Sequence, residues 1–164
     1  MNIESEERTL KLIMFISFVG LVDAIYLSYL HHLVSQGVGC PTQDLPGLDC
    51  GVVLASEQAK IFGIPVAWLG VVGFLMLIVL SLDRFLNMDL ERTYYNKILL
   101  PVTGIIGVIF GSYLTYAEAF IIEEWCPFCV VAFLLTIAAT FFCISEYGYE
   151  IKELISNNGL EKKT

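Results

Sequence analysis

The sequence predicts an all-α membrane protein, in which four transmembrane helices form a bundle in a single domain. Of its 164 residues, 57% are hydrophobic and 16% are charged, and the mean hydropathy is +0.74. This composition leaves too few polar residues to cover a soluble domain. Four long apolar runs stand out, and none alternates polar with apolar residues as a barrel strand would. The expected spans are residues 10–34, 62–82, 98–122 and 126–145.

Each run approaches or exceeds the length of about 20 residues with which a helix crosses the hydrocarbon core of a bilayer. The first run is too long for the apolar region of a cleaved signal peptide, and no small-residue cleavage site follows it. It is therefore expected to stay in the membrane as the first helix.

The segment 35–61 between the first two spans is expected to be an outer loop. Its first part is rich in turn-forming residues, and Gly51 to Ile61 is too short and too mixed to span a membrane. We expect a short helix at the interface there. Pro65 follows, where it can occupy the first turn of the second helix.

Three glycines of the third span, Gly104, Gly107 and Gly111, allow either close helix packing or the approach of a flat ring. The fourth span is followed by an expected cytoplasmic tail, residues 146–164.

The basic residues predict the orientation in the membrane. With both termini in the cytoplasm, eight of the nine Lys and Arg residues lie inside, and only Lys60 lies outside. This asymmetry follows the positive-inside rule, to which the acidic residues behind the net charge of −8 contribute little. The acidic balance also argues against nucleic-acid binding. We expect a multi-pass protein of the cell membrane, or of the endoplasmic reticulum in a eukaryote.

Four of the five cysteines lie on the outer side in this topology. Cys40 and Cys50 belong to the outer loop, and Cys126 and Cys129 follow the third span. The outer side is an oxidising compartment in which disulfides form and persist. Cys143 lies within the fourth span, where we expect a small buried hydrophobic residue without chemistry.

The motif Cys126-Pro127-Phe128-Cys129 opens the fourth helix. Residues three apart are separated by about 60° around a helix axis, so both sulfurs share one face and can bridge. Pro127 suits the first helical position, where its missing N–H has no intrahelical partner. The positive end of the helix dipole stabilises a thiolate. The motif therefore predicts a redox-active dithiol at the membrane edge.

The motif has two other interpretations. Half of a zinc site is disfavoured because Cys40 and Cys50 are not closely spaced, and no His follows His31 and His32 in the outer segments. An inert structural disulfide stays open.

The nine residues between Cys40 and Cys50 close readily into a disulfide loop. Two dithiols in one compartment permit a relay in which a mobile loop brings Cys50 onto Cys126. The alternative is that the Cys40–Cys50 pair only staples the loop.

A dithiol at the end of a helix bundle, at the membrane edge, can pass electrons to a lipid-soluble quinone, which takes up two electrons and two protons. Asp23 near the middle of the first span and Glu118 near the end of the third are ionisable groups in a membrane, and are therefore functional candidates. An internal hydrogen bond to a Tyr or Ser would explain either one without catalysis.

Three stretches together resemble the vitamin K epoxide reductase family and its prokaryotic homologues. They are Cys50-Gly-Val-Val-Leu-Ala-Ser56, Phe62-Gly-Ile-Pro-Val-Ala-Trp-Leu-Gly70 and Trp125-Cys-Pro-Phe-Cys129. The resemblance covers essentially the whole four-helix core. No fused thioredoxin-like domain is expected, because the chain ends about twenty residues after the fourth span.

The resemblance implies a role for each cysteine of the outer side. Cys126 and Cys129 match the active-site pair, with Cys129 nearest the quinone, and Cys40 and Cys50 match the shuttle pair. A thioredoxin-fold redox protein would reduce the shuttle disulfide, and Cys50 would then attack Cys126. The net result is disulfide formation in exported proteins.

The resemblance also implies a quinone site without a metal. Ser56, Phe62 and Phe133 are its candidate quinone-binding residues, and the substrate would be a menaquinone, a ubiquinone or a vitamin K-type quinone. Where the animal vitamin K enzymes carry a tyrosine that hydrogen-bonds the quinone, this chain has Phe133. The loss of that hydroxyl favours a prokaryotic quinone-linked oxidase over a vitamin K epoxide or quinone reductase. The interval between Cys40 and Cys50 is longer than is usual in the family.

Two further alternatives come from outside this family. The other bacterial disulfide-forming quinone reductase is also a four-helix bundle, but there the close cysteine pair follows the first helix, whereas here it precedes the last. A non-enzymatic membrane scaffold stapled by disulfides is the remaining alternative.

Overall fold

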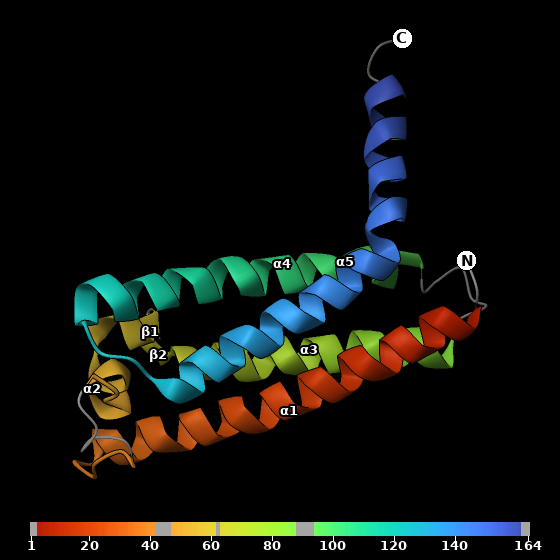
Figure 1. Cartoon of the computed structure of the whole chain (residues 1–164). Helices are drawn as coiled ribbons and strands as arrows, with labels where there is room; N and C mark the ends of the chain where they lie inside the picture. The colour runs from red at the N-terminus through yellow and green to blue at the C-terminus, as the bar shows by residue number, and fades with distance from the viewer. Residues whose placement is uncertain (1–2, 42–46, 62, 88–93, 162–164) are drawn as a thin grey trace.

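Four long helices lie side by side in the computed structural model, which describes residues 3–41, 47–61, 63–87 and 94–161 (Figure 1). Each is long and apolar enough to cross a membrane. The predicted four-helix membrane bundle is thus confirmed, and the chain is a multi-pass membrane protein. The helices are α1 (Ile3–Ser35), α3 (Val66–Leu86), α4 (Tyr94–Ala117) and α5 (Pro127–Glu161).

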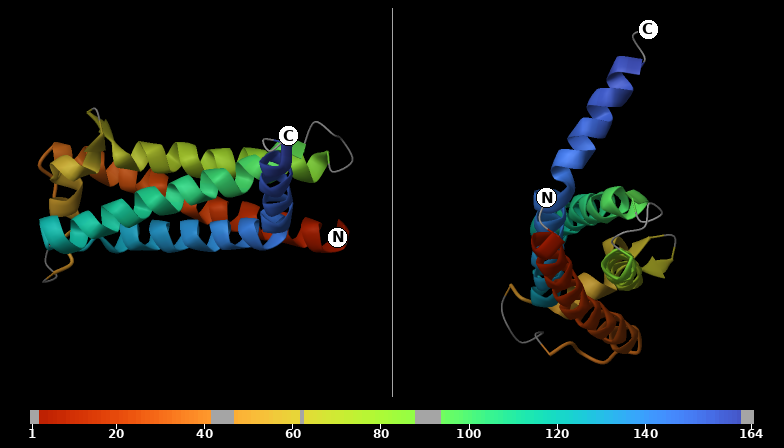
Figure 2. Two further views of the ribbon diagram at one scale, coloured as in Figure 1. Left: turned by 90° about the horizontal axis from the view of Figure 1, so that it is seen from above. Right: turned by 90° about the vertical axis from the view of Figure 1, so that its right-hand side faces the viewer.

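The helix α5 continues through Glu161, beyond the expected end of the fourth span at 145. Its last part turns away from the bundle, as both views of Figure 2 show. The helix α4 passes directly into one π-helical turn, η3 (Glu118–Ile122), which ends at Glu123 in a left-handed conformation with φ 59°.

The second long helix begins at Val66 rather than at 62. Before it, β1 (Lys60–Ile61) pairs with β2 (Ile64–Pro65) as a small antiparallel hairpin, with Gly63 at φ 80° in its turn. A positive φ is readily adopted by glycine because it has no Cβ. Gly63 and the second strand occupy residues that the apolar run alone assigned to the helix.

The expected short helix of the loop is divided in two by Ser56. The first part is α2 (Cys50–Ala55), and the second is a 3-10 turn, η1 (Glu57–Ala59). Ser56 has an extended backbone, its hydroxyl donates to the Val53 carbonyl oxygen at 2.7 Å, and it accepts from the Ala59 amide at 3.3 Å. One serine therefore ends the first helix and caps the second.

Close packing explains the glycines of α4. A Cβ at Gly104 would lie 2.5 Å from Thr140 Oγ1, and a Cβ at Gly111 would collide with the Phe133 ring. The absence of these side chains lets α4 approach α5 directly.

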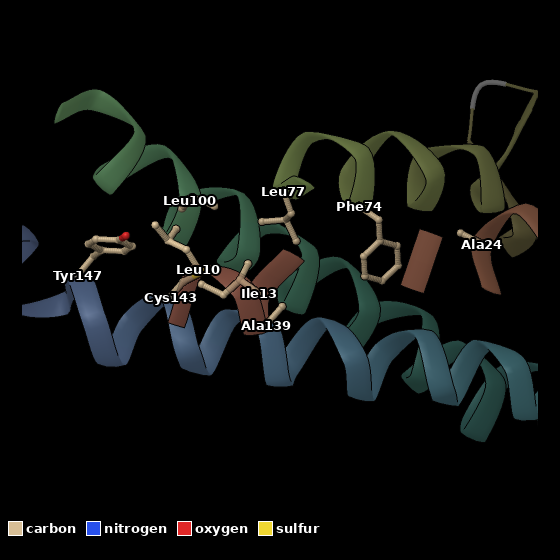
Figure 3. Packing of buried hydrophobic residues seen from close by; sticks show 9 residues of the cluster. All are labelled: Leu10, Ile13, Ala24, Phe74, Leu77, Leu100, Ala139, Cys143 and Tyr147. Carbon is tan, nitrogen blue, oxygen red and sulfur yellow. The ribbon is translucent and has the colours of Figure 1, made fainter. Parts of the chain in front are cut away.

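At the end of the bundle opposite α2, a hydrophobic core joins the long helices (Figure 3). Leu10, Ile13, Leu100, Cys143 and Tyr147 are all fully buried there. The Cys143 side chain therefore packs as a small apolar group.

A buried polar cluster ties three helices together at this end. Glu6 Oε1 of α1 accepts hydrogen bonds from Arg84 Nε of α3 at 2.8 Å and from the Tyr147 hydroxyl of α5 at 3.1 Å. Glu6 and Arg84 are 5% and 6% exposed. Removal of one partner would leave the other as an uncompensated buried charge.

We predict that Glu6→Ala destabilises the protein by about 3 kcal/mol, because Arg84 loses its buried partner. Thermal unfolding in detergent micelles would measure the change. The matched control is Glu4→Ala, which removes an exposed pair with Arg8 at 3.9 Å and should cost less than about 0.5 kcal/mol. Equal losses in both variants would contradict the role given to the buried pair.

Candidate functional site

The fold gathers four cysteines at the end of the bundle that carries α2. Cys50 is the first residue of α2, and Cys126 directly precedes α5. Cys40, Cys50 and Cys126 are buried in one cluster, against which Cys129 packs. The two cysteine pairs that the sequence separates by 76 residues thus share one site.

The four sulfurs form a continuous row. Cys50 Sγ lies 2.8 Å from Cys126 Sγ, compared with about 2.05 Å for a disulfide bond. The Cys50 side chain is also hydrogen-bonded to that of Cys40, and the Cys126 side chain to that of Cys129. The contact between Cys50 and Cys126 joins one predicted pair to the other.

Two contacts hold the loop against the segment that precedes α5. The Trp125 amide donates to the Gly47 carbonyl oxygen at 3.3 Å, and the Asp49 amide donates to Glu124 Oε2 at 3.3 Å. The Asp49 side chain also caps α2, because its Oδ1 accepts from the Gly51 amide at 2.8 Å and from the next amide at 3.2 Å. These bonds fix Cys50 directly after the cap.

The close cysteine pair begins α5, as the sequence predicts. Pro127 is the first helical residue, the Cys129 amide donates to Cys126 Sγ at 3.4 Å, and the Val130 amide donates to the Cys126 carbonyl oxygen at 3.1 Å. The Phe128 ring packs edge-on against Tyr26 of α1, with 5.1 Å between ring centroids. The motif is thereby fixed against the bundle.

Hydrogen bonding makes Cys126 the site of the thiolate. The side chains of Cys129 and Cys50 and the backbone amides of the helix start lower the pKa of Cys126 from 9.0 to about 4, although burial opposes this shift. The pKa of Cys50 is raised, because its thiol donates to Cys126 and because it is buried. In the reduced protein the negative charge therefore resides on Cys126.

Glu118 approaches the same cysteines from η3. It is 3% exposed, and its Oε2 accepts from the Cys126 amide at 3.2 Å. Its carboxylate also interacts with the Cys129 thiol. The sequence suggested a Tyr or Ser as the partner of Glu118, whereas the groups that it meets here belong to the two cysteines of the motif.

Asp23 has a different environment. Its Oδ2 is buried and has no hydrogen-bond partner among the described residues. Asp23 is also not among the residues of the cavity wall described next.

A cavity of about 180 Å³ lies between the four long helices, and residues of α2 and η1 form part of its wall. Its wall is mostly apolar, with Leu27, Val53, Phe74 and Phe110 among the larger side chains. A mostly apolar pocket with a few polar groups is the usual form of a small-molecule site. The polar residues of the wall are His31, Ser56, Gln58, Thr103, Thr115, Glu118, Cys129 and Thr136.

The predicted site residues divide between the sulfur row and the cavity. Cys129, Ser56 and Phe133 line the cavity, whereas Cys40, Cys50 and Cys126 belong only to the row of sulfurs. Cys129 belongs to both. Phe62, the remaining candidate, lies outside the described residues.

His31 and Gln58 also belong to the wall, although neither was predicted from the sequence. A signal for His31 was present, because Ala24, Leu27 and His31 follow one another at helical spacing and share a face of α1. No comparable signal existed for Gln58, which reaches the cavity through the turn η1.

The described residues contain no group of three or more His, Cys, Asp or Glu side chains arranged to hold a metal ion.

Comparison with known proteins identifies the family. No curated protein matches the chain. A model of the vitamin K epoxide reductase family matches residues 11–144, which include the greater part of every long helix, the sulfur row and the cavity. The chain therefore belongs to the vitamin K epoxide reductase family and is a multi-pass membrane oxidoreductase.

Proposed function

We propose that this protein is a quinone-dependent thiol–disulfide oxidoreductase that supports disulfide bond formation. It passes electrons from a thioredoxin-fold partner through Cys40 and Cys50 to Cys126 and Cys129, and from there to a quinone. The observation that carries the proposal is the 2.8 Å contact between Cys50 Sγ and Cys126 Sγ, next to a cavity wall that contains Cys129.

The first half of the cycle is thiol–disulfide exchange. A thiolate of the reduced partner attacks the Cys40–Cys50 disulfide, and its second thiol completes the transfer, so that the partner leaves oxidised. Cys50 then attacks Cys126 of the Cys126–Cys129 disulfide and releases Cys129. Cys40 attacks Cys50 in turn, which restores the Cys40–Cys50 disulfide and frees Cys126. Each step exchanges one S–S bond for another.

The low pKa of Cys126 favours this order. A thiol with a low pKa leaves a disulfide more readily. When Cys40 attacks the mixed disulfide, Cys126 is therefore the better leaving group than Cys50, whose pKa is raised. The electrons move toward the cavity.

The second half of the cycle is quinone reduction in the cavity. The Cys126–Cys129 dithiol gives up two electrons as its disulfide forms, and the quinone takes up two electrons and two protons. The apolar wall suits a flat, lipid-soluble ring. Phe133 in this wall offers the ring a face but no hydrogen-bond donor, which fits quinone reduction better than epoxide reduction.

The distribution of basic residues supports the orientation that this function needs. Among the described residues, Lys60 is the only Lys or Arg on the side of the cysteines, which makes this side extracytoplasmic by the positive-inside rule. Disulfides form and persist in that compartment.

Electron transfer by purified protein tests the function. In detergent, with a reduced thioredoxin-fold donor and a soluble quinone, we expect loss of quinone absorbance and one oxidised donor for each quinone consumed. The Cys143→Ser variant should retain this activity, because Cys143 lies in the opposite core. A wild-type protein that transfers no electrons, under conditions where an established quinone-linked thiol oxidase does, would indicate a disulfide-stapled scaffold.

The relay order predicts different behaviour for two cysteine variants. Cys129→Ser should favour the Cys50–Cys126 disulfide, because Cys126 has lost its own disulfide partner and only Cys40 can then resolve this bridge. Cys40→Ser should lose exchange with the protein donor but remain reducible by a small dithiol. Alkylation and peptide mapping would identify the bridges in each variant. If the two variants gave the same bridges and the same donor dependence, the order would be wrong.

The thiolate on Cys126 predicts a pH dependence. Since its pKa in the folded protein lies near 4 and below the ordinary 9.0, the thiolate is present at neutral pH and is lost as the pH falls through about 4. Ultraviolet thiolate absorbance of the reduced protein should follow this course. Cys126→Ser should remove the signal. If the thiolate absorbance appeared only when the pH rose above the ordinary thiol pKa of 9.0, the assignment of the thiolate to Cys126 would be wrong.

A further inference from the structure

A buried carboxylate at the cavity has no counterion in the part of the chain that the structure describes. Glu118 is 3% exposed, and among the described residues no Lys, Arg or His forms an ion pair with it. Ionisable groups are costly within a membrane and are retained there mainly for function. The π-helical turn that begins at Glu118 is also a feature that is frequent at functional sites.

The hydrogen-bond partners of Glu118 are groups that change state in the proposed cycle. Its Oε2 accepts from the Cys126 amide at 3.2 Å, and its carboxylate interacts with the Cys129 thiol. Glu118 and Cys129 both line the cavity. A quinone in contact with Cys129 would therefore lie within reach of the same carboxylate.

Reduction of a quinone needs protons as well as electrons. The sulfur row supplies two electrons, but Cys126 is already a thiolate, so the dithiol brings only the proton of Cys129. Most of the cavity wall is apolar and cannot transfer protons. A group that moves the Cys129 proton to the quinone oxygen is required at the point where sulfur and quinone meet.

We propose that Glu118 is this catalytic proton carrier, an assignment that rests on the proposed function. As Cys129 Sγ forms a bond to a ring carbon of the quinone, Glu118 takes the thiol proton and gives it to a carbonyl oxygen. The Cys126 thiolate then attacks Cys129 Sγ. The S–S bond forms, the S–C bond breaks, and the second quinone oxygen takes a proton from water. The dithiol is oxidised by two electrons, the quinone is reduced by two, and Glu118 returns to its starting state.

A purely structural role for Glu118 makes a different prediction. If the carboxylate only holds the Cys126 amide, an amide oxygen would serve equally well. Glu118→Gln keeps an acceptor of nearly the same shape but cannot carry the proton. This variant therefore separates the two roles.

A single-turnover experiment tests the proposal in the full chain. The protein is fully reduced, freed of reductant and mixed with a soluble quinone, and both quinone absorbance and the Cys126–Cys129 disulfide are followed. We expect Glu118→Gln to slow quinone reduction by about 100-fold, the scale of general acid–base catalysis. Glu118→Asp, which keeps the proton-carrying group, should recover part of the rate. The rate at which a small dithiol reduces the Cys126–Cys129 disulfide should change less than about twofold, since that step does not need the carrier.

The matched control is Glu123→Gln, which makes the same change at an exposed residue just after η3. It should react as the wild type does. A Glu118→Gln protein that reduces quinone at the wild-type rate would overturn the assignment, as would equal slowing of quinone reduction and of dithiol exchange. Failure of the wild type itself to reduce quinone would instead contradict the proposed function.

Discussion

The arrangement of the site depends on one contact, that between the start of α2 and the start of α5. Cys50 and Cys126 meet there at 2.8 Å because the Asp49 cap and the bond from the Trp125 amide to Gly47 hold two distant segments together. These hydrogen bonds hold the outer loop in place and so bring the two sulfurs together.

The two ends of the bundle use buried polar groups for different purposes. Glu6 is neutralised by Arg84 and further bonded by Tyr147, so its charge is compensated and the cluster joins three helices. Glu118 has no such partner among the described residues; it accepts a hydrogen bond from the Cys126 amide and interacts with the Cys129 thiol. A compensated pair favours a single packing, whereas an uncompensated acid next to reactive thiols favours proton transfer.

The sequence predicted the features that depend on composition and local spacing. The four helices follow from apolar length, and the position of Cys126 and Cys129 at a helix start follows from Pro127 and the Cys-x-x-Cys spacing. The features that depend on tertiary contacts could not be predicted in this way. The hairpin before Val66, the division of the loop helix at Ser56 and the approach of Gln58 to the cavity arise from packing against the bundle. The partners of Glu118 depend on the π-helical turn, and no residue pattern in the third span predicts this turn.

The Cys-x-x-Cys motif connects two environments within one helical turn. Three residues of helix advance only about 4.5 Å, yet Cys126 lies outside the apolar spans, against Cys50 of the loop, whereas Cys129 lies in the wall of the apolar cavity. Thiol exchange needs a thiolate that another sulfur can reach, and reduction of a lipid-soluble molecule needs a sulfur that faces an apolar space. Neither cysteine meets both needs alone. Because a disulfide can join sulfurs at this spacing, the proposed transfer of electrons between the two environments needs no large movement of the helices.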